Sequence, residues 1–178
     1  MQNSKLMINI FGPSTAGKST LARLIEDRID RLYTVDFDVI KRQLSGYHWR
    51  RDSEVAAIIS LGTLESVARI GLPILSSFPA PDSEATYNRI ADAARRNDYK
   101  IVNIEITAPN DVLVARYEDR LRRIKESGTN WKFKTLDEFK QRLLEPYYRP
   151  EGSFSFDSSK MSPDEILAAV DTILQQRL

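Results

Sequence analysis

Cysteine is absent from this 178-residue sequence, which excludes disulfides, thiolate metal sites and cysteine nucleophiles. Long apolar runs are also missing, and none approaches the roughly 20 residues that a membrane-spanning helix needs. The chain has little net charge, since 26 basic residues face 25 acidic ones. The overall charge therefore predicts no affinity for membranes or long nucleic acids. Residues 1–5 contain neither a charged leader nor an apolar secretory core, so we expect a cytoplasmic protein.

Short apolar runs alternate along the chain with longer segments of helical periodicity. We expect strands over residues 6–11, 33–37, 72–78, 99–106 and 154–156, and helices over residues 18–29, 39–44, 54–70, 83–96 and 109–126. Two further helices begin at capping boxes, Thr135 with Glu138 and Ser162 with Glu165. This alternation predicts one α/β domain over residues 1–178, with a parallel sheet covered by helices on both faces.

A glycine-rich loop follows the first predicted strand and matches the pattern G-x-x-x-x-G-K-[ST] in full. Its residues are Gly12, Pro13, Ser14, Thr15, Ala16, Gly17, Lys18 and Ser19, with Thr20 after them. The glycines allow a tight turn whose backbone N–H groups point at an anion, and the helix that follows adds its positive dipole end. The ammonium of Lys18 suits β- and γ-phosphates, and the Ser19 hydroxyl suits Mg²⁺. A chance match in a turn is the alternative, which the strand-to-helix context disfavours.

Two aspartates, Asp36 and Asp38, come at the end of the second predicted strand. Ligands bind outside the carboxyl ends of strands in open α/β sheets, so both side chains should approach the loop. Strand alternation predicts both on one side, with Phe37 toward the core. We expect Asp36 near the metal and Asp38 near an acceptor hydroxyl. The alternative for Asp38 is an N-cap of the next helix.

The loop and the segment from Val35 to Leu44 together resemble the small P-loop kinases. That group includes polynucleotide 5′-kinase domains, chloramphenicol phosphotransferase, and zeta-toxin-type, shikimate and gluconate kinases. The resemblance implies the three-layer P-loop NTPase sandwich, with a five-stranded parallel sheet of order 2-3-1-4-5. It also implies a mobile lid, which we place around residues 120–135.

The same resemblance implies roles for particular residues. Asp38 takes the place of the general base, and Lys41 stands where a substrate-contacting arginine is commoner. One departure is the end of the third strand, where many relatives carry an aspartate and this chain has Ser76 and Ser77. This leaves Asp36 as the carboxylate on the metal side.

Arg116 and Arg120 lie in a segment that resembles the lid-proximal helix of these kinases. Arginines at this spacing reach the adenine or the transferring phosphate there, and a guanidinium fork suits γ-phosphoryl oxygens. The i, i+4 spacing places both on one helix face. A solvated charged face is the alternative, and Arg142 is a further candidate for a lid contact.

The acceptor side is expected between the second and third strands. Residues 46–51 include His48, Trp49, Arg50 and Arg51, which could stack on a ring and hold a carboxylate or phosphate. A plain connection between two helices is the other interpretation.

These patterns predict a kinase that uses ATP or another nucleoside triphosphate with Mg²⁺ and phosphorylates a hydroxyl of a small molecule or nucleotide-type acceptor. Near-neutral charge leaves nucleic acid only as a 5′-end substrate. The alternative is a P-loop ATPase or regulatory module without an acceptor. A GTPase is disfavoured because no Asn-Lys-x-Asp segment is present.

Overall fold

The structure is a computed structural model that describes residues 5–126 and 135–177. Its centre is a five-stranded parallel sheet of order β2-β3-β1-β4-β5. The strands are β1 (Leu6–Phe11), β2 (Tyr33–Asp36), β3 (Ile74–Ser77), β4 (Lys100–Thr107) and β5 (Phe154–Asp157). The predicted strand order and parallel sheet are confirmed.

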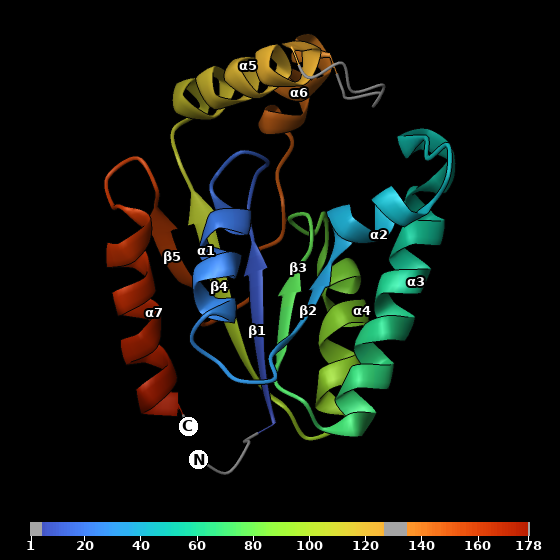
Figure 1. The fold of residues 1–178 in the computed structure, drawn as a ribbon, viewed down its shortest axis with the longest axis vertical. Helices are drawn as coiled ribbons and strands as arrows, with labels where there is room; N and C mark the ends of the chain where they lie inside the picture. The colour runs from blue at the N-terminus through green and yellow to red at the C-terminus, as the bar shows by residue number, and fades with distance from the viewer. Residues whose placement is uncertain (1–4, 127–134, 178) are drawn as a thin grey trace.

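Helices cover both faces of this sheet, as Figure 1 shows. They are α1 (Lys18–Glu26), α2 (Phe37–Gln43), α3 (Trp49–Ile70), α4 (Glu84–Arg95), α5 (Asn110–Glu126), α6 (Leu136–Leu144) and α7 (Pro163–Arg177). Helices α1 and α7 pack on one face, and α3 and α4 pack on the other. None of the helices within the described ranges is long and apolar enough to cross a membrane.

The central strand β1 is buried on both faces, and its six residues all lie in the interior. Ile8 and Ile10 join the core beneath α1 and α7, whereas Met7 joins the core beneath α3 and α4. This alternation is the period-2 pattern of a strand between two helical layers. The glycine-rich loop therefore starts from one of the most buried strands of the molecule.

A chain of buried polar side chains crosses the sheet beside β1. Asn9 donates to Asn103 over 2.9 Å and accepts from the Ser76 hydroxyl over 2.9 Å. Asn103 donates in turn to the Tyr87 hydroxyl at 2.9 Å. Because unpaired buried amides are costly, these bonds favour one lateral register of β3, β1 and β4.

Helices α5 and α6 lie beyond the carboxyl ends of the strands, at the top of Figure 1. The ring of Tyr117 on α5 stacks on the ring of Phe139 on α6, with centroids 3.9 Å apart and planes 6° from parallel, and this contact holds the two helices together. Both predicted capping boxes are confirmed at the starts of α6 and α7. The expected lid overlaps the end of α5, but its residues 127–134 lie outside the described residues.

The largest differences from the sequence prediction are at two helix boundaries. Helix α1 ends at Glu26 rather than near residue 29. Helix α3 begins at Trp49 instead of residue 54, and the Asp52 carboxylate accepts the His48 backbone N–H at 2.7 Å. A carboxylate in the first turn of a helix meets backbone donors that lack partners, which accounts for the earlier start.

Candidate active site

The glycine-rich loop joins β1 directly to α1, and its two glycines have backbone angles that other residues avoid. Gly12 has φ 132° and Gly17 has φ 107°. A Cβ atom on Gly12 would lie 2.1 Å from the Ile106 carbonyl oxygen at the end of β4. Only glycine permits this approach, so β4 and the loop can close together at this point.

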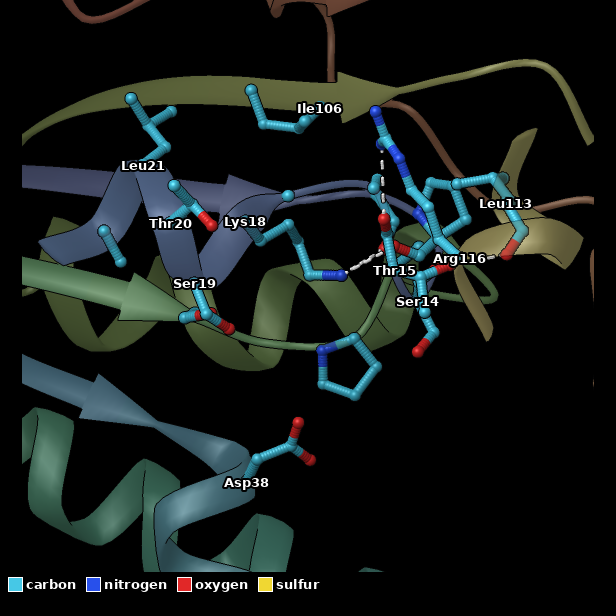
Figure 2. Close-up of a pocket in the computed structure, with 18 of the residues that line it drawn as sticks. Ser14, Thr15, Lys18, Ser19, Thr20, Leu21, Asp38, Ile106, Leu113 and Arg116 are labelled. Atoms are coloured by element: carbon cyan, nitrogen blue, oxygen red, sulfur yellow. Dashed lines mark hydrogen bonds between the residues drawn. The ribbon is translucent and has the colours of Figure 1, made fainter. Parts of the chain in front are cut away.

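Lys18 is the first residue of α1, and its side chain folds back over the loop. Its Nζ donates to the carbonyl oxygens of Gly12 at 2.9 Å and Pro13 at 2.8 Å, as Figure 2 shows in part. Burial lowers the pKa of Lys18 to about 8, although the carboxylates of Asp38 and Asp36 act to raise it. The ammonium is therefore a desolvated charge at a helix N-terminus, an arrangement suited to anions.

The paired aspartates differ from the prediction in one respect. Asp36 ends β2 and is itself the N-cap of α2, accepting the backbone N–H groups of Asp38 at 2.7 Å and Val39 at 3.3 Å. The alternative of Asp38 as N-cap is therefore wrong, because Asp38 is the second residue of the helix, within its first turn. Phe37 is buried, as predicted. The chain turns into a helix at Phe37, so strand alternation does not extend to Asp38.

The Asp38 carboxylate is directed toward the loop from the opposite wall, as Figure 2 shows. It pairs with Lys41 at 2.8 Å. Burial acts to raise the pKa of Asp38, but the charge and hydrogen bond of Lys41, with Arg120 and Lys18, hold it below its usual value. Asp38 is therefore a carboxylate that stays ionised near neutral pH.

Helix α5 brings both predicted arginines to the pocket. Arg116 donates to the Ser158 hydroxyl at 2.8 Å, to the Ser158 carbonyl at 2.9 Å, and to the Thr15 carbonyl at 3.4 Å. Arg120 is close enough for its charge to influence the pKa values of both Lys18 and Asp38. The two arginines therefore differ: Arg116 joins α5 to Thr15 and Ser158, whereas the charge of Arg120 acts on Lys18 and Asp38.

These side chains line one open cavity of about 1750 Å³ at the carboxyl edge of the sheet. Its lining includes the whole loop from Gly12 to Thr20, together with further predicted residues: Asp36, Asp38, Lys41, Arg116, Arg120 and Arg142. A cavity of this size can hold a nucleotide and a second molecule.

The structure does not bring Arg50 and Arg51 into this cavity. Arg50 lies 3.9 Å from Glu138 and Arg51 lies 2.8 Å from Asp52, with their side chains 70% and 69% exposed. Neither belongs to the lining, whereas Tyr47 from the same segment does. The earlier start of α3 explains the difference, since both arginines lie in its first turn.

Several cavity residues carry no signal in the sequence. Tyr147 follows α6, lines the cavity, and donates its hydroxyl to the buried Glu105 carboxylate at 2.6 Å. Burial, and then Glu105, raise the pKa of Tyr147. Its ring packs edge-on against Phe11 at 6.5 Å, directly before the loop. Ser158 is equally silent in the sequence, because its role arises only when β5 lies beside β4.

This sheet order, with a phosphate loop between β1 and α1, defines the fold of the small P-loop kinases. Residues 7–146, more than half of the chain, match the family described as "AAA domain". The chain belongs to that family. No curated protein matches the sequence.

Solved structures agree on the fold. A candidate kinase from Chloroflexus aurantiacus is 21% identical, with a TM-score of 0.73 over 99% of each chain. An APS kinase from Mycobacterium tuberculosis, solved with AMPPNP and APS, is 19% identical with a TM-score of 0.61 over 97% of this chain and 98% of its own. A gluconokinase from Sinorhizobium meliloti is 17% identical, with a TM-score of 0.63 over 92% of this chain and 88% of its own. These neighbours share the P-loop kinase architecture.

Proposed function

We propose that this protein is an ATP-dependent kinase that transfers the γ-phosphate of ATP, or of another nucleoside triphosphate, to a hydroxyl of a small-molecule or nucleotide-type acceptor. The observation that carries the proposal is that Lys18, Asp36, Asp38 and Arg120 line one cavity, where the charges of the other three act on the pKa of Lys18. A phosphate-binding cation, a carboxylate near the acceptor and a lid-side arginine are the parts that phosphoryl transfer needs.

The phosphate side consists of the loop itself. Backbone N–H groups of residues 14–19, which include the start of α1, would hold the phosphate oxygens, and Lys18 would approach the β- and γ-phosphates. Because the pKa of Lys18 is about 8, its ammonium begins to lose its proton just above neutral pH. A nearby triphosphate would raise that pKa again and keep Lys18 charged.

Mg²⁺ would be held by Ser19 and Asp36. Both residues line the cavity, and the Asp36 oxygen Oδ1 accepts both capping N–H groups, which leaves Oδ2 for a metal or its water. No cluster of three or more metal-ligating side chains occurs in residues 5–126 and 135–177, and Mg²⁺ on a nucleotide requires none, because phosphates and waters supply most of its ligands. Once bound, it would supply positive charge against the β- and γ-phosphate oxygens.

In the proposed step the acceptor oxygen attacks the γ-phosphorus, the bond from that phosphorus to the β,γ-bridging oxygen breaks, and ADP leaves. Asp38 orients the acceptor hydroxyl and takes its proton. Because the pKa of Asp38 is lowered by Lys41 and Arg120, Asp38 is a weak base. A loose transition state suits a weak base, since the proton then moves late. Arg120 would meet the charge on the γ-phosphoryl oxygens.

The acceptor would lie against α2 and the segment after α6. Here the cavity offers aromatic and cationic side chains, namely Tyr47, Phe78, Tyr147, Lys41, Arg42 and Arg142. Lys41 is fixed between Asp38 and the Phe37 ring, with its Nζ 4.4 Å from the ring centroid. This mixture suits a ring-bearing acceptor with polar substituents, and nucleic acid would fit only by its 5′ end.

The test is a panel of metabolites and oligonucleotide 5′ ends scored for ATP-dependent phosphate transfer, with acceptor-free hydrolysis measured in parallel. Asp38→Asn should bind nucleotide like the native protein and lose about 10²-fold or more in transfer. A steady hydrolysis that no acceptor stimulates, and that Asp38→Asn leaves unchanged, would favour a P-loop ATPase without an acceptor.

A further inference from the structure

Thr15, in the middle of the phosphate loop, has a backbone conformation that its side chain disfavours. Its φ is 65°, in the left-handed region. The branched Cβ of threonine makes this region costly, by roughly 1–3 kcal/mol, whereas glycine adopts it freely. Something outside residue 15 must therefore stabilise the conformation.

Helix α5 supplies two contacts to this residue, as Figure 2 shows. The Thr15 hydroxyl lies 3.0 Å from the Leu113 carbonyl oxygen and 2.6 Å from that of Ser14, and shares its single proton between them. Arg116 donates to the Thr15 carbonyl at 3.4 Å. The Thr15 side chain therefore donates one hydrogen bond to α5, and the Thr15 backbone carbonyl accepts one from α5.

Helix α5 is itself firmly placed at this end. Leu113 is 1% exposed in the core. Arg116 is bound to Ser158, whose N–H and hydroxyl both reach the Thr107 carbonyl, at 2.9 and 3.1 Å. Thr15 therefore contacts a well-packed part of the fold, which resists displacement.

We infer that Thr15 is a positioning residue: its hydroxyl, through Leu113, holds the phosphate loop in the conformation that binds phosphates and couples the loop to the helix that carries Arg116 and Arg120. The inward direction of successive loop N–H groups depends on left-handed residues within the turn. With glycine at position 15 no outside contact would be needed, and with threonine α5 provides it. The consequence for nucleotide binding rests on the proposed function, whereas the coupling itself does not.

Three substitutions distinguish two roles for the Thr15 hydroxyl. In the first, a conformational hold, the hydroxyl stabilises the left-handed backbone of residue 15; in the second, an ordinary contact, it only forms a hydrogen bond with α5. Thr15→Ser keeps the hydroxyl, Thr15→Val keeps the shape and the β-branch without the hydroxyl, and Thr15→Gly removes the hydroxyl together with the conformational cost. An ordinary contact is lost equally in the valine and glycine variants. A conformational hold is needed only where a Cβ is present.

The first measurement is amide hydrogen exchange of the unliganded protein over peptides spanning residues 12–19 and 110–117. We expect exchange in both peptides to be about threefold faster or more in Thr15→Val and close to native in Thr15→Ser. Equal exchange in the valine and serine variants would overturn the inference, whatever the protein binds.

The second measurement is the affinity for ADP with Mg²⁺ by calorimetry. We expect Thr15→Val to bind about tenfold more weakly, Thr15→Ser within about twofold of native, and Thr15→Gly clearly more tightly than Thr15→Val. Glycine and valine variants that are equally weak would reduce Thr15 to a contact residue. A native protein that binds no ADP would count against the proposed function, and the exchange measurement would still decide the role of Thr15.

Discussion

The two sides of the cavity are built in different ways. The phosphate side uses backbone groups, two glycines with left-handed backbones, and a lysine whose ammonium is bound by carbonyls of the same loop. The proposed acceptor side uses side chains that pair along their own helix, Lys41 with Asp38 on α2 and Arg142 with Glu145 at the end of α6. The phosphate side is fixed by close backbone packing, whereas the acceptor side consists of groups that a substitution can change one at a time.

This difference explains how one fold can serve several acceptors. Substitutions in the loop disturb β1, β4 and α1 together, because Gly12 meets Ile106 and Lys18 begins a helix. Arg42 and Arg142 are exposed residues of the cavity wall, so we expect substitutions there to change the wall and leave the loop in place.

Gly12→Ala should have the largest effect. A Cβ atom 2.1 Å from the Ile106 carbonyl oxygen forces β4 and the loop apart, and alanine also disfavours φ 132°. We expect a loss of about 3 kcal/mol or more in the free energy of unfolding, measured by urea denaturation. Gly62→Ala is the matched control: it lies within α3 with nothing inside 4 Å, so it should stabilise by up to about 1 kcal/mol. Equal changes for the two variants would contradict the close packing of the loop.

Lys18→Ala should follow. Removal of the ammonium takes away one contact aimed at transferring phosphate, and we expect turnover to fall by about 10²-fold, equivalent to about 3 kcal/mol. Steady-state kinetics with the best acceptor of the panel measure the loss. Lys5→Ala, at the opposite end of β1, is the control and should retain native turnover. A loss below about threefold in a folded Lys18 variant would remove Lys18 from the mechanism.

Tyr147→Phe tests how much the hydrogen bond from Tyr147 to Glu105, at the cavity wall, contributes to stability. The variant loses the hydroxyl that donates to the buried Glu105 carboxylate at 2.6 Å, while Arg149 stays 3.3 Å from it. We expect a destabilisation of about 1.5 kcal/mol in urea denaturation. Tyr33→Phe, at an exposed tyrosine, should change stability by less than about 0.5 kcal/mol. Similar values for both would mean that the Glu105 contact contributes nothing.

Nucleotide affinity should depend on pH through Lys18. Its pKa in the free protein is about 8, and bound phosphates favour the protonated form, so binding takes up a proton above pH 8. We expect affinity for ADP with Mg²⁺ to fall about tenfold from neutral pH to pH 9. Calorimetry in buffers of different ionisation enthalpy measures the uptake. Lys18→Arg stays charged over this range and should show no uptake, and an unchanged uptake in it would assign the proton to another group.

Arg142→Ala should change stability least. Its partner Glu145 and Arg142 itself are 55% and 42% exposed, and such surface pairs contribute little. We expect a change within about 0.5 kcal/mol, with a raised KM for the acceptor and an unchanged KM for ATP. Arg69→Ala, which breaks a similar exposed pair with Glu65 on α3, controls for the pair alone and should leave both KM values native. An effect of Arg142→Ala on ATP instead would move this side chain to the phosphate side.

The sequence predicted elements more reliably than their ends. The strand order came from the resemblance, and the strand–helix alternation, both capping boxes and the buried Phe37 were read from local patterns. The start of α3 was missed because Asp52 acts through a backbone contact that no periodicity reveals. That miss also accounts for Arg50 and Arg51, which were expected in the site and lie outside it.

The glycine-rich loop could be recognised from sequence because its residues are consecutive: 12–17 form the turn, 18 and 19 begin α1, and their types and order predict the chemistry. Asp36 and Asp38 were found because a strand end has a fixed place in an α/β sheet. The contacts of Arg116 with Thr15 and Ser158, and of Tyr147 with Glu105, join residues 101 and 42 positions apart. Such pairs meet only when β4, β5 and α5 pack together, so the wall proposed for the acceptor and the support of the loop were decided by the tertiary structure.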